Sequence, residues 1–240
     1  MNNIKVKICG LMKSPDMELC MGLGVDILGF VVEYPLPVPW NLDRTRARLL
    51  LGKVRKPHQS CLVTGGSPDK IISLAAELRP SLVQLHYRET LEDTAIITGG
   101  LKKMGIGVIK TVPASVEDRF DQFGTADIKT IVEKLNKTDL LALLADSRSP
   151  SSAAKTGTIL DYSFYRQVSR LSSKPVIAAG GITPANAVSF LTGTGAEFID
   201  IMTGIETSPG EKDAGLLSEL FSSIRSLDTS RDRIRTTGED

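Results

Sequence analysis

Eight short apolar runs, separated by segments with helical spacing, constrain the fold of this chain more than any other feature. They are rich in leucine or β-branched residues and alternate only weakly, which is typical of parallel strands covered on both faces. Alternating strands and helices favour a parallel sheet, and eight strands favour closure into a single-domain (β/α)8 TIM barrel. An open, doubly wound α/β sheet is the alternative. The runs span residues 5–9, 27–32, 60–64, 82–86, 107–112, 140–146, 175–180 and 198–203.

Three of the intervening segments carry a signal for the start of a helix. Ser14, Ser67 and Thr183 are each followed directly by proline. A hydroxyl side chain can cap the first turn, and proline fits the first helical position because its missing N–H is not needed there. We therefore expect helices to begin at these points.

The length of 240 residues suits one barrel domain, and no internal linker is evident. The proline-rich stretch 34–40 directly follows a predicted strand, so we interpret it as a stiff loop over the barrel mouth. The end of the chain is charged and nearly free of apolar residues. We expect the barrel to cover residues 1–226 and residues 227–240 to form a flexible tail.

Composition narrows the class of partner. With 29 basic and 28 acidic residues, the chain offers no global electrostatic attraction to nucleic acid or an anionic membrane, so a small polar partner suits it better. No apolar stretch approaches the about 20 residues that span a bilayer, and the N-terminus lacks a signal-peptide core. The three cysteines and two histidines show no metal-ligand spacing. We expect a cytoplasmic protein with reduced thiols and no metal site.

Two reactive side chains end predicted strands. Cys9 ends the first strand within Lys7-Ile8-Cys9-Gly10, and Asp146 ends the sixth. The carboxyl ends of barrel strands usually hold the catalytic residues. Lys7 lies two positions before Cys9, hence on the same face of the strand, where its charge would favour the thiolate. We therefore predict that Cys9 and Asp146 are catalytic.

Structural interpretations stand beside these functional ones. A cysteine in an apolar segment is more often an inert core residue, and we interpret Cys20 and Cys61 in that way. Asp146 could instead cap a turn or pair with a lysine. We interpret His86 as a strand-end histidine that is hydrogen-bonded for structure.

Two glycine-containing loops indicate a phosphate site. Gly180 and Gly181 follow the seventh predicted strand, and Thr203 and Gly204 follow the eighth. Main-chain amides near a helix N-terminus bind anions, and the loops after strands seven and eight commonly form the phosphate site of this fold. The alternative is that the glycines only permit a tight turn. Asp200 precedes the second loop and either orients it or contacts the substrate.

Seven motifs occur in an order known from one family. They are Lys7-Ile8-Cys9-Gly10, Leu28-Gly29-Phe30-Val31, Val83-Gln84-Leu85-His86, Val108-Ile109-Lys110, Leu144-Ala145-Asp146, Ala179-Gly180-Gly181-Ile182 and Asp200-Ile201-Met202-Thr203-Gly204-Ile205-Glu206-Thr207-Ser208-Pro209-Gly210-Glu211-Lys212-Asp213. Together they resemble the successive signatures of the phosphoribosylanthranilate isomerase family. The resemblance runs from about residue 5 to residue 225, and its first and last motifs are the specific ones.

This resemblance implies an isomerase of tryptophan biosynthesis that needs no metal or organic cofactor. The implied reaction is the Amadori rearrangement of N-(5-phosphoribosyl)anthranilate to 1-(2-carboxyphenylamino)-1-deoxyribulose 5-phosphate. Asp146 matches the family's general acid, which protonates the furanose ring oxygen, and Cys9 its general base, which removes the proton from ribose C2. The implied partner is this small phosphorylated substrate, and the chain would be a monomer or a homodimer. The predicted substrate-binding residues are Lys7, Gly180, Gly181, Asp200, Thr203 and Gly204.

The chain departs from the family where the substrate carboxylate should bind. The family carries an arginine after the second strand, whereas residues 35–41 contain no cation here. A bidentate guanidinium contact is therefore missing from its expected place. Arg44, Arg46 and Arg48 lie in the following predicted helix and should point elsewhere.

Smaller departures affect three other loops: Tyr87 replaces a usual glycine, Met202-Thr203 replaces two serines, and the loop at residues 151–158 is altered. Three functions therefore stay open. The first is the isomerase with its carboxylate bound by Lys155 or Arg148. The second is a paralogue acting on another phosphorylated sugar or amine, with Tyr34 and Trp40 shaping the pocket. The third is a phosphometabolite-binding barrel without turnover, which retention of both Cys9 and Asp146 disfavours.

Overall fold

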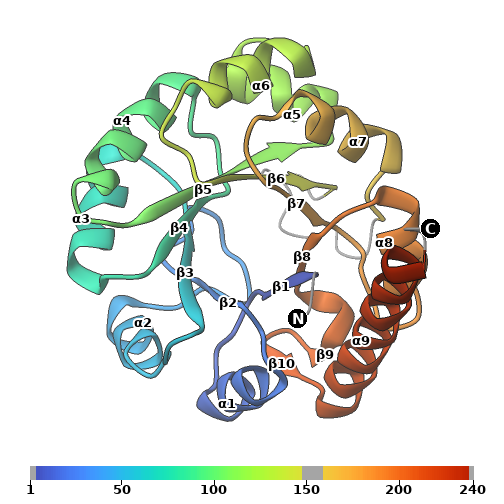
Figure 1. Cartoon of the computed structure of the whole chain (residues 1–240). Coiled ribbons are helices and arrows are strands. Elements are labelled where there is room, and N and C mark those ends of the chain that lie inside the picture. Colours follow the sequence, from blue (N-terminus) through green and yellow to red (C-terminus); the bar gives the residue numbers. More distant parts are fainter. Residues whose placement is uncertain (1–3, 148–158, 238–240) are drawn as a thin grey trace.

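The computed structural model describes residues 4–147 and 159–237, which form a closed barrel of eight parallel strands (Figure 1). Neighbouring strands follow the chain order, and β8 pairs with β1 to close the ring. The predicted barrel is confirmed, and each predicted strand boundary is correct to within two residues. The strands are β1 (Lys5–Ile8), β2 (Ile27–Val31), β3 (Gln59–Thr64), β4 (Leu82–Leu85), β5 (Gly107–Pro113), β6 (Ala142–Asp146), β7 (Val176–Ala179) and β8 (Phe198–Ile201).

Helices form the outer layer of the barrel, as Figure 1 shows. Two of them, α5 and α6, follow β5, and the loop after β8 holds the short elements η1 (Thr203–Ile205), β9 (Glu206–Ser208) and β10 (Glu211–Lys212). The last helix packs beside α8 and α1. The helices are α1 (Ser14–Leu23), α2 (Arg44–Leu51), α3 (Pro68–Leu78), α4 (Leu91–Lys102), α5 (Val116–Phe123), α6 (Ile128–Asn136), α7 (Tyr162–Leu171), α8 (Ala187–Thr194) and α9 (Ala214–Thr237).

Two of the predicted helix starts lie at or beside the observed ones. Ser67 is the N-cap of α3, and its side chain accepts a hydrogen bond from the N–H of Lys70 at 3.4 Å. Helix α1 begins at Ser14, but its N-cap is Lys13, so the signal is displaced by one residue. In both helices proline occupies the first turn, where no main-chain donor is needed.

The barrel has two apolar clusters because successive side chains of a strand point to opposite sides. One fills the space between strands and helices. The other lines the interior and includes Cys9, Cys61 and Trp40, the last from the loop after β2. Trp40 is only 3% exposed, which agrees with the prediction that the proline-rich loop covers the barrel mouth.

Helix α9 crosses the predicted boundary between barrel and tail at residue 226. The helix continues to Thr237, so the backbone of most of the predicted tail is helical. The flexibility of residues 227–240 stays a prediction. Among the described residues, no helix is both long and apolar enough to cross a membrane.

Candidate active site

Strand alternation turns both predicted catalytic residues into the barrel. Cys9 follows β1 and belongs to the interior cluster, and Asp146 ends β6 two positions after the interior residue Leu144. Both are nearly buried, at 6% and 7% exposure. They therefore lie at the carboxyl end of the barrel, where we expected them.

A buried ion pair lies one strand layer beneath Cys9. Lys7 and Asp200 are paired in register across β1 and β8, and Lys7 Nζ donates to Asp200 Oδ2 at 2.7 Å. The Lys7 side chain is fully buried. Burial disfavours its charge, but Asp200 and the thiols of Cys9 and Cys61 together raise the pKa of Lys7 above its usual value, so the ammonium is retained. The charges of Lys7 and Asp200 therefore lie close enough to influence the pKa of the Cys9 thiol.

Burial raises the pKa of the Cys9 thiol. Lys7 and Lys212 act in the opposite direction and lower it, while Asp200 adds to the increase. The expectation that Lys7 favours the thiolate is therefore correct in sign, but burial outweighs it. The Cys9 thiol therefore holds its proton more strongly than an ordinary thiol does.

Gly29 on β2 is a part of this site that sequence analysis did not single out. A Cβ atom there would lie 3.1 Å from both Cys9 Sγ and Lys7 Nζ. Glycine therefore leaves the space in which the thiol and the ammonium group approach each other. The sequence signal was present, because Gly29 belongs to one of the quoted motifs, but its reason needs the neighbouring strand.

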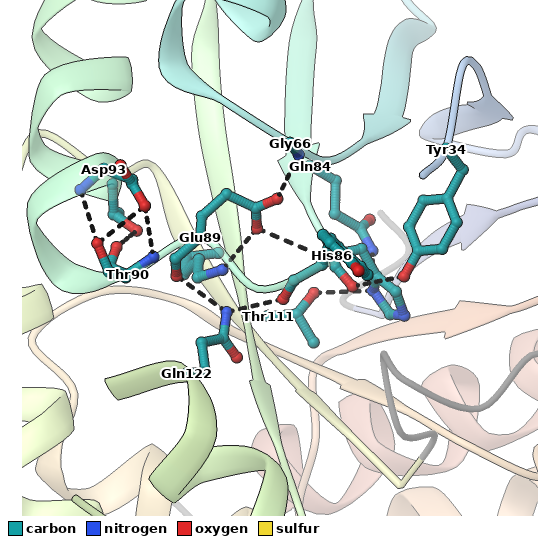
Figure 2. Close-up of polar contacts among 12 residues, drawn as sticks. Tyr34, Gly66, Gln84, His86, Glu89, Thr90, Asp93, Thr111 and Gln122 are labelled. Atoms are coloured by element: carbon teal, nitrogen blue, oxygen red, sulfur yellow. Dashed lines mark hydrogen bonds and ion pairs between the residues drawn. The ribbon is translucent and has the colours of Figure 1, made fainter. Parts of the chain in front are cut away.

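His86 lies beside Asp146, which sequence analysis also did not foresee. Its Nε2 is 3.6 Å from Asp146 Oδ2. Its Nδ1 lies 3.1 Å from the amide nitrogen of Gln84 and 2.9 Å from the hydroxyl of Thr111 (Figure 2). Both neighbours can donate, so Nδ1 acts as acceptor and the proton lies on Nε2, facing the carboxylate. The structural interpretation of His86 is confirmed, and its contact with Asp146 adds a functional one.

The loops after β7 and β8 meet, as the phosphate-site prediction requires. A Cβ atom at Gly204 would lie 1.9 Å from the carbonyl oxygen of Ile182, and one at Gly180 would lie 1.9 Å from Ser147 Oγ. Gly180 and Gly181 have φ angles of 121° and 61°, which glycine adopts readily. Within the described residues, the N–H groups of these two glycines have no acceptor. They are therefore available to an anion.

The predicted helix start at Thr183 is wrong. Helix α8 begins at Ala187 with Asn186 as N-cap. The Asn186 side chain accepts from the N–H of Thr183 at 2.8 Å and donates to the carbonyl of Gly181 at 2.8 Å, so it holds an irregular turn before the helix. The anion would be bound by this loop rather than directly by the helix end.

The proline-rich loop is fixed to the loop after β8. Trp40 Nε1 donates to the Glu206 carboxylate at 3.1 and 3.2 Å, and Lys212 Nζ contacts Glu206 Oε1 at 2.6 Å. Gly10 lies against this tryptophan, where a Cβ would be 2.9 Å from Trp40 Cδ1. Trp40 thus borders the space above Cys9.

The arginines of α2 are occupied, as expected. Arg44 binds Glu33 and Glu77, Arg48 pairs with Glu77, and Arg46 donates to the carbonyl of Met12. The other two candidates for the carboxylate, Arg148 and Lys155, lie outside the described residues, as does the loop at 151–158. Within the part of the chain that is described, no three His, Cys, Asp or Glu side chains cluster as metal ligands.

Comparisons with known proteins agree with this geometry. The family model for N-(5'phosphoribosyl)anthranilate (PRA) isomerase matches residues 6–223. The isomerase of Haloferax volcanii is 30% identical over 210 residues, covering 87% of both chains. That of Methanosarcina acetivorans is 26% identical over 225 residues, covering 92% of this chain and 93% of the relative.

Solved structures show the same barrel. Phosphoribosyl anthranilate isomerase from Thermus thermophilus superimposes with a TM-score of 0.72 at 25% identity, covering 93% of this chain and all of that one. An isomerase in complex with reduced 1-(o-carboxyphenylamino)-1-deoxyribulose 5-phosphate gives a TM-score of 0.72 at 22% identity, with 93% and 99% coverage. With the family model matched over nearly the whole barrel, this chain belongs to the N-(5'-phosphoribosyl)anthranilate isomerase family.

Proposed function

We propose that Cys9 and Asp146 perform the acid-base chemistry of this isomerase. Family membership makes the chain an isomerase of tryptophan biosynthesis that rearranges N-(5'-phosphoribosyl)anthranilate. The observation that supports the two residue roles is their placement: both point into the carboxyl end of the barrel, each beside groups that influence its proton.

Asp146 is the proposed general acid. Its proton goes to the furanose ring oxygen as the C1–O bond breaks, which leaves an open-chain iminium ion. The Nε2–H of His86 faces the carboxylate that remains, 3.6 Å away in this structure. His86 would therefore stabilise the carboxylate and hold its orientation, acting as a positioning residue.

Cys9 is the proposed general base. Its thiolate removes the proton from C2, the C–H electron pair forms the C1–C2 double bond, and the iminium nitrogen becomes neutral. C1 then gains a proton and the hydroxyl on C2 loses one, so the enolamine becomes the ketose with no net change in protons. Lys7 and Asp200 lie beneath the thiol, and the burial of Lys7 indicates a positioning role for it rather than contact with substrate.

The substrate phosphate is proposed to bind at the loops after β7 and β8. The N–H groups of Gly180 and Gly181 supply donors, and Thr203 and Gly204 lie in the adjoining loop. Phosphate oxygens accept such main-chain hydrogen bonds well. We also keep as proposals a cytoplasmic location, a barrel unit of residues 1–226, and a monomeric or homodimeric state. One relative, from Thermotoga maritima, is described as dimeric.

The test follows the fluorescence of freshly made phosphoribosylanthranilate with four proteins: the unmodified chain, Cys9→Ala, Asp146→Ala and Cys20→Ala. The first two substitutions should each lower turnover by roughly 10²- to 10⁴-fold, the usual contribution of a general acid or base. Cys20 is an equally buried thiol on α1, and its substitution controls for the loss of a buried cysteine.

Unchanged turnover in Cys9→Ala or Asp146→Ala would remove that residue from the mechanism. A folded chain that binds the substrate without converting it would favour the non-catalytic barrel. Conversion of other phosphorylated aldoses alone would favour the paralogue.

A further inference from the structure

The proposed substrate carries a carboxylate on an aromatic ring, and a protein usually meets such a group with a cation beside aromatic side chains. Which cation of this chain meets the carboxylate is a question that rests on the proposed function. In the described loops that follow the strands, one arginine, Arg88 after β4, has neither a carboxylate nor a main-chain carbonyl partner. The described cations of these loops and of the adjoining helix ends that do have such partners are Lys13, Arg44, Arg46, Arg48, Lys70, Arg119 and Lys212.

Arg88 lies at the end of an aromatic wall. Its guanidinium carbon is 5.9 Å from the centre of the Tyr87 ring, and Tyr87 meets Tyr34 edge to face at 5.8 Å. Tyr34 lies 6.3 Å from the His86 ring and donates its hydroxyl to the His86 carbonyl at 3.0 Å (Figure 2). The wall therefore runs from the neighbour of the acid Asp146 across the ends of β2 and β4 to a guanidinium group.

The loop that carries Arg88 is held on both sides of this residue. The amide nitrogen of Gln122, on α5, donates to the carbonyl of Tyr87 at 2.9 Å and to that of Glu89 at 3.0 Å (Figure 2). Gln122 is itself buried. One side chain thus fixes the carbonyl groups of the two residues that flank Arg88.

Glu89 adds a second anchor. Its carboxylate pairs with Lys110 at 2.8 Å, with both side chains fully buried, and accepts from the N–H groups of Gly66 and Tyr87, each at 3.2 Å. A buried ion pair contributes little to stability compared with an apolar pair of the same size, so its effect here is to fix position. The Glu89 carboxylate connects the loop to Gly66, which follows β3, and to Lys110 on β5, and it also bonds Tyr87 within the loop.

The same loop then enters α4 through a capping box. Thr90 accepts from the N–H of Asp93 at 3.1 Å, and the Asp93 carboxylate accepts from the N–H of Thr90 at 3.0 Å (Figure 2). Arg88 is therefore an exposed cation, without an ion pair in the part of the chain that is described, on a short segment whose neighbours are all fixed. Such preorganisation lowers the entropy lost when a ligand is bound.

We propose that Arg88 binds the carboxylate of the substrate's aromatic acid, with Tyr87 and Tyr34 lining the side of its ring. The guanidinium group comes from the loop after β4, which makes Arg88 a specificity-determining residue of this chain. The sequence agrees, because residues 35–41 offer no cation and Tyr87 adds an aromatic ring directly before Arg88. A guanidinium and a carboxylate can form two parallel hydrogen bonds.

The experiment compares two substrates on two variants. N-(5'-phosphoribosyl)anthranilate has the carboxylate and N-(5'-phosphoribosyl)aniline lacks it, and a chromatographic assay of the ketose product follows both. In Arg88→Gln, the KM for the first should rise by about 10- to 100-fold, the usual worth of a hydrogen bond to a charged group, with a small change in kcat. The KM for the second should not change.

Arg79→Gln is the matched control. Arg79 is another exposed arginine without an ion pair among the described residues, and it ends α3 at the opposite end of β4. The same chemical change there should leave both substrates unaffected. Gln122→Ala, which frees the loop, should raise the KM for anthranilate less than Arg88→Gln does and leave kcat nearly unchanged.

Three results would overturn the assignment. An equal KM increase for both substrates in Arg88→Gln would make the effect general rather than specific for the carboxylate. An unchanged KM together with an anthranilate-specific loss in Arg148→Gln or Lys155→Gln would place the contact in the loop after β6. No conversion of either substrate by the unmodified chain would refute the proposed function, and this inference with it, whereas turnover without an effect of Arg88 refutes the inference alone.

Discussion

Two buried lysine-carboxylate pairs, Lys7–Asp200 and Lys110–Glu89, have opposite surroundings. Lys7 and Asp200 meet at 2.7 Å inside the barrel, in register across β1 and β8. Lys110 and Glu89 meet at 2.8 Å, and Lys110 projects from β5 to the outer side, 5.8 Å from the Phe123 ring of α5. Burial is comparable, so the difference between the pairs comes from what else each contacts.

The pKa values of Lys7 and Lys110 shift in opposite directions, which indicates different roles for the two pairs. Lys7 also faces two thiols, which add to the effect of Asp200 and raise its pKa although burial acts against this. Burial lowers the pKa of Lys110, because it outweighs the charges of Glu89 and Asp93, which act to raise it. The inner pair is part of a charge network that includes Cys9, whereas the outer pair connects a loop to the barrel.

The largest expected effect comes from breaking each pair. Lys7→Met and Lys110→Met both leave a buried carboxylate without its partner, which should lower the free energy of unfolding by about 3–5 kcal/mol in a urea titration. The kinetic results should differ. Lys7→Met should lower kcat, because Cys9 loses a cation that favours its thiolate, while Lys110→Met should raise KM, because the Arg88 loop loosens.

Apolar replacement of each whole pair is the control for unfolding. Lys7→Met with Asp200→Leu, and Lys110→Met with Glu89→Leu, leave no unpaired buried charge and should recover stability. The kinetic differences should persist in these double variants. The same kinetic change at both sites would mean that the pairs share one role and would contradict the comparison.

A second effect is a shift in pH dependence. Asp200 is one of the groups that raise the pKa of Cys9, so Asp200→Asn should lower that pKa toward the ordinary thiol value. The thiolate would then form at lower pH, and the rise of kcat/KM with pH should shift in the acidic direction. Glu89→Gln should cause no shift. Thiolate absorbance, corrected with the Cys9→Ala protein, measures the pKa directly.

The opposite result is expected if Lys7 becomes neutral once the Asp200 carboxylate is removed, because Cys9 then loses a cation that lowers its pKa. An unchanged or raised pKa of Cys9 in Asp200→Asn would show that outcome. The ammonium of Lys7 would then depend on Asp200, and the inner pair would act as one unit.

The sequence predicts well those features that are determined within a single strand or helix. The apolar runs locate β1 and β6, and alternation within each strand turns Cys9 and Asp146 inward without knowledge of any other segment. The N-cap at Ser67 is likewise local. These features follow from positions only a few residues apart.

What the sequence does not predict depends on closure and register. Lys7 and Asp200 are 193 positions apart and pair only because β8 lies beside β1. The Glu89–Lys110 pair needs the β4 loop and β5 together. The helix expected at Thr183 begins instead at Ala187, after a turn in which the Thr183 carbonyl accepts from the N–H groups of Asn186 and Ala187, contacts that sequence spacing alone does not reveal.

The smallest expected effect separates the two pairs through glycines. Gly29 touches the inner pair, since a Cβ there would lie 3.1 Å from Lys7 Nζ and Cys9 Sγ. Gly66 donates to Glu89 of the outer pair and has a φ of 123°, where other residues are strained. Gly29→Ala and Gly66→Ala should each cost about 1–3 kcal/mol of stability, by overpacking and by backbone strain respectively.

Steady-state kinetics then test whether each glycine reports on its own pair. Gly29→Ala should lower kcat with little change in KM, because the added methyl group pushes the thiol and the ammonium group apart. Gly66→Ala should raise the KM for anthranilate and spare kcat, because it disturbs the Glu89 anchor of the Arg88 loop. A rise in KM for Gly29→Ala would instead mean that the substrate occupies the space beside Gly29. The Lys7–Asp200 pair would then lie closer to the binding site than its burial indicates.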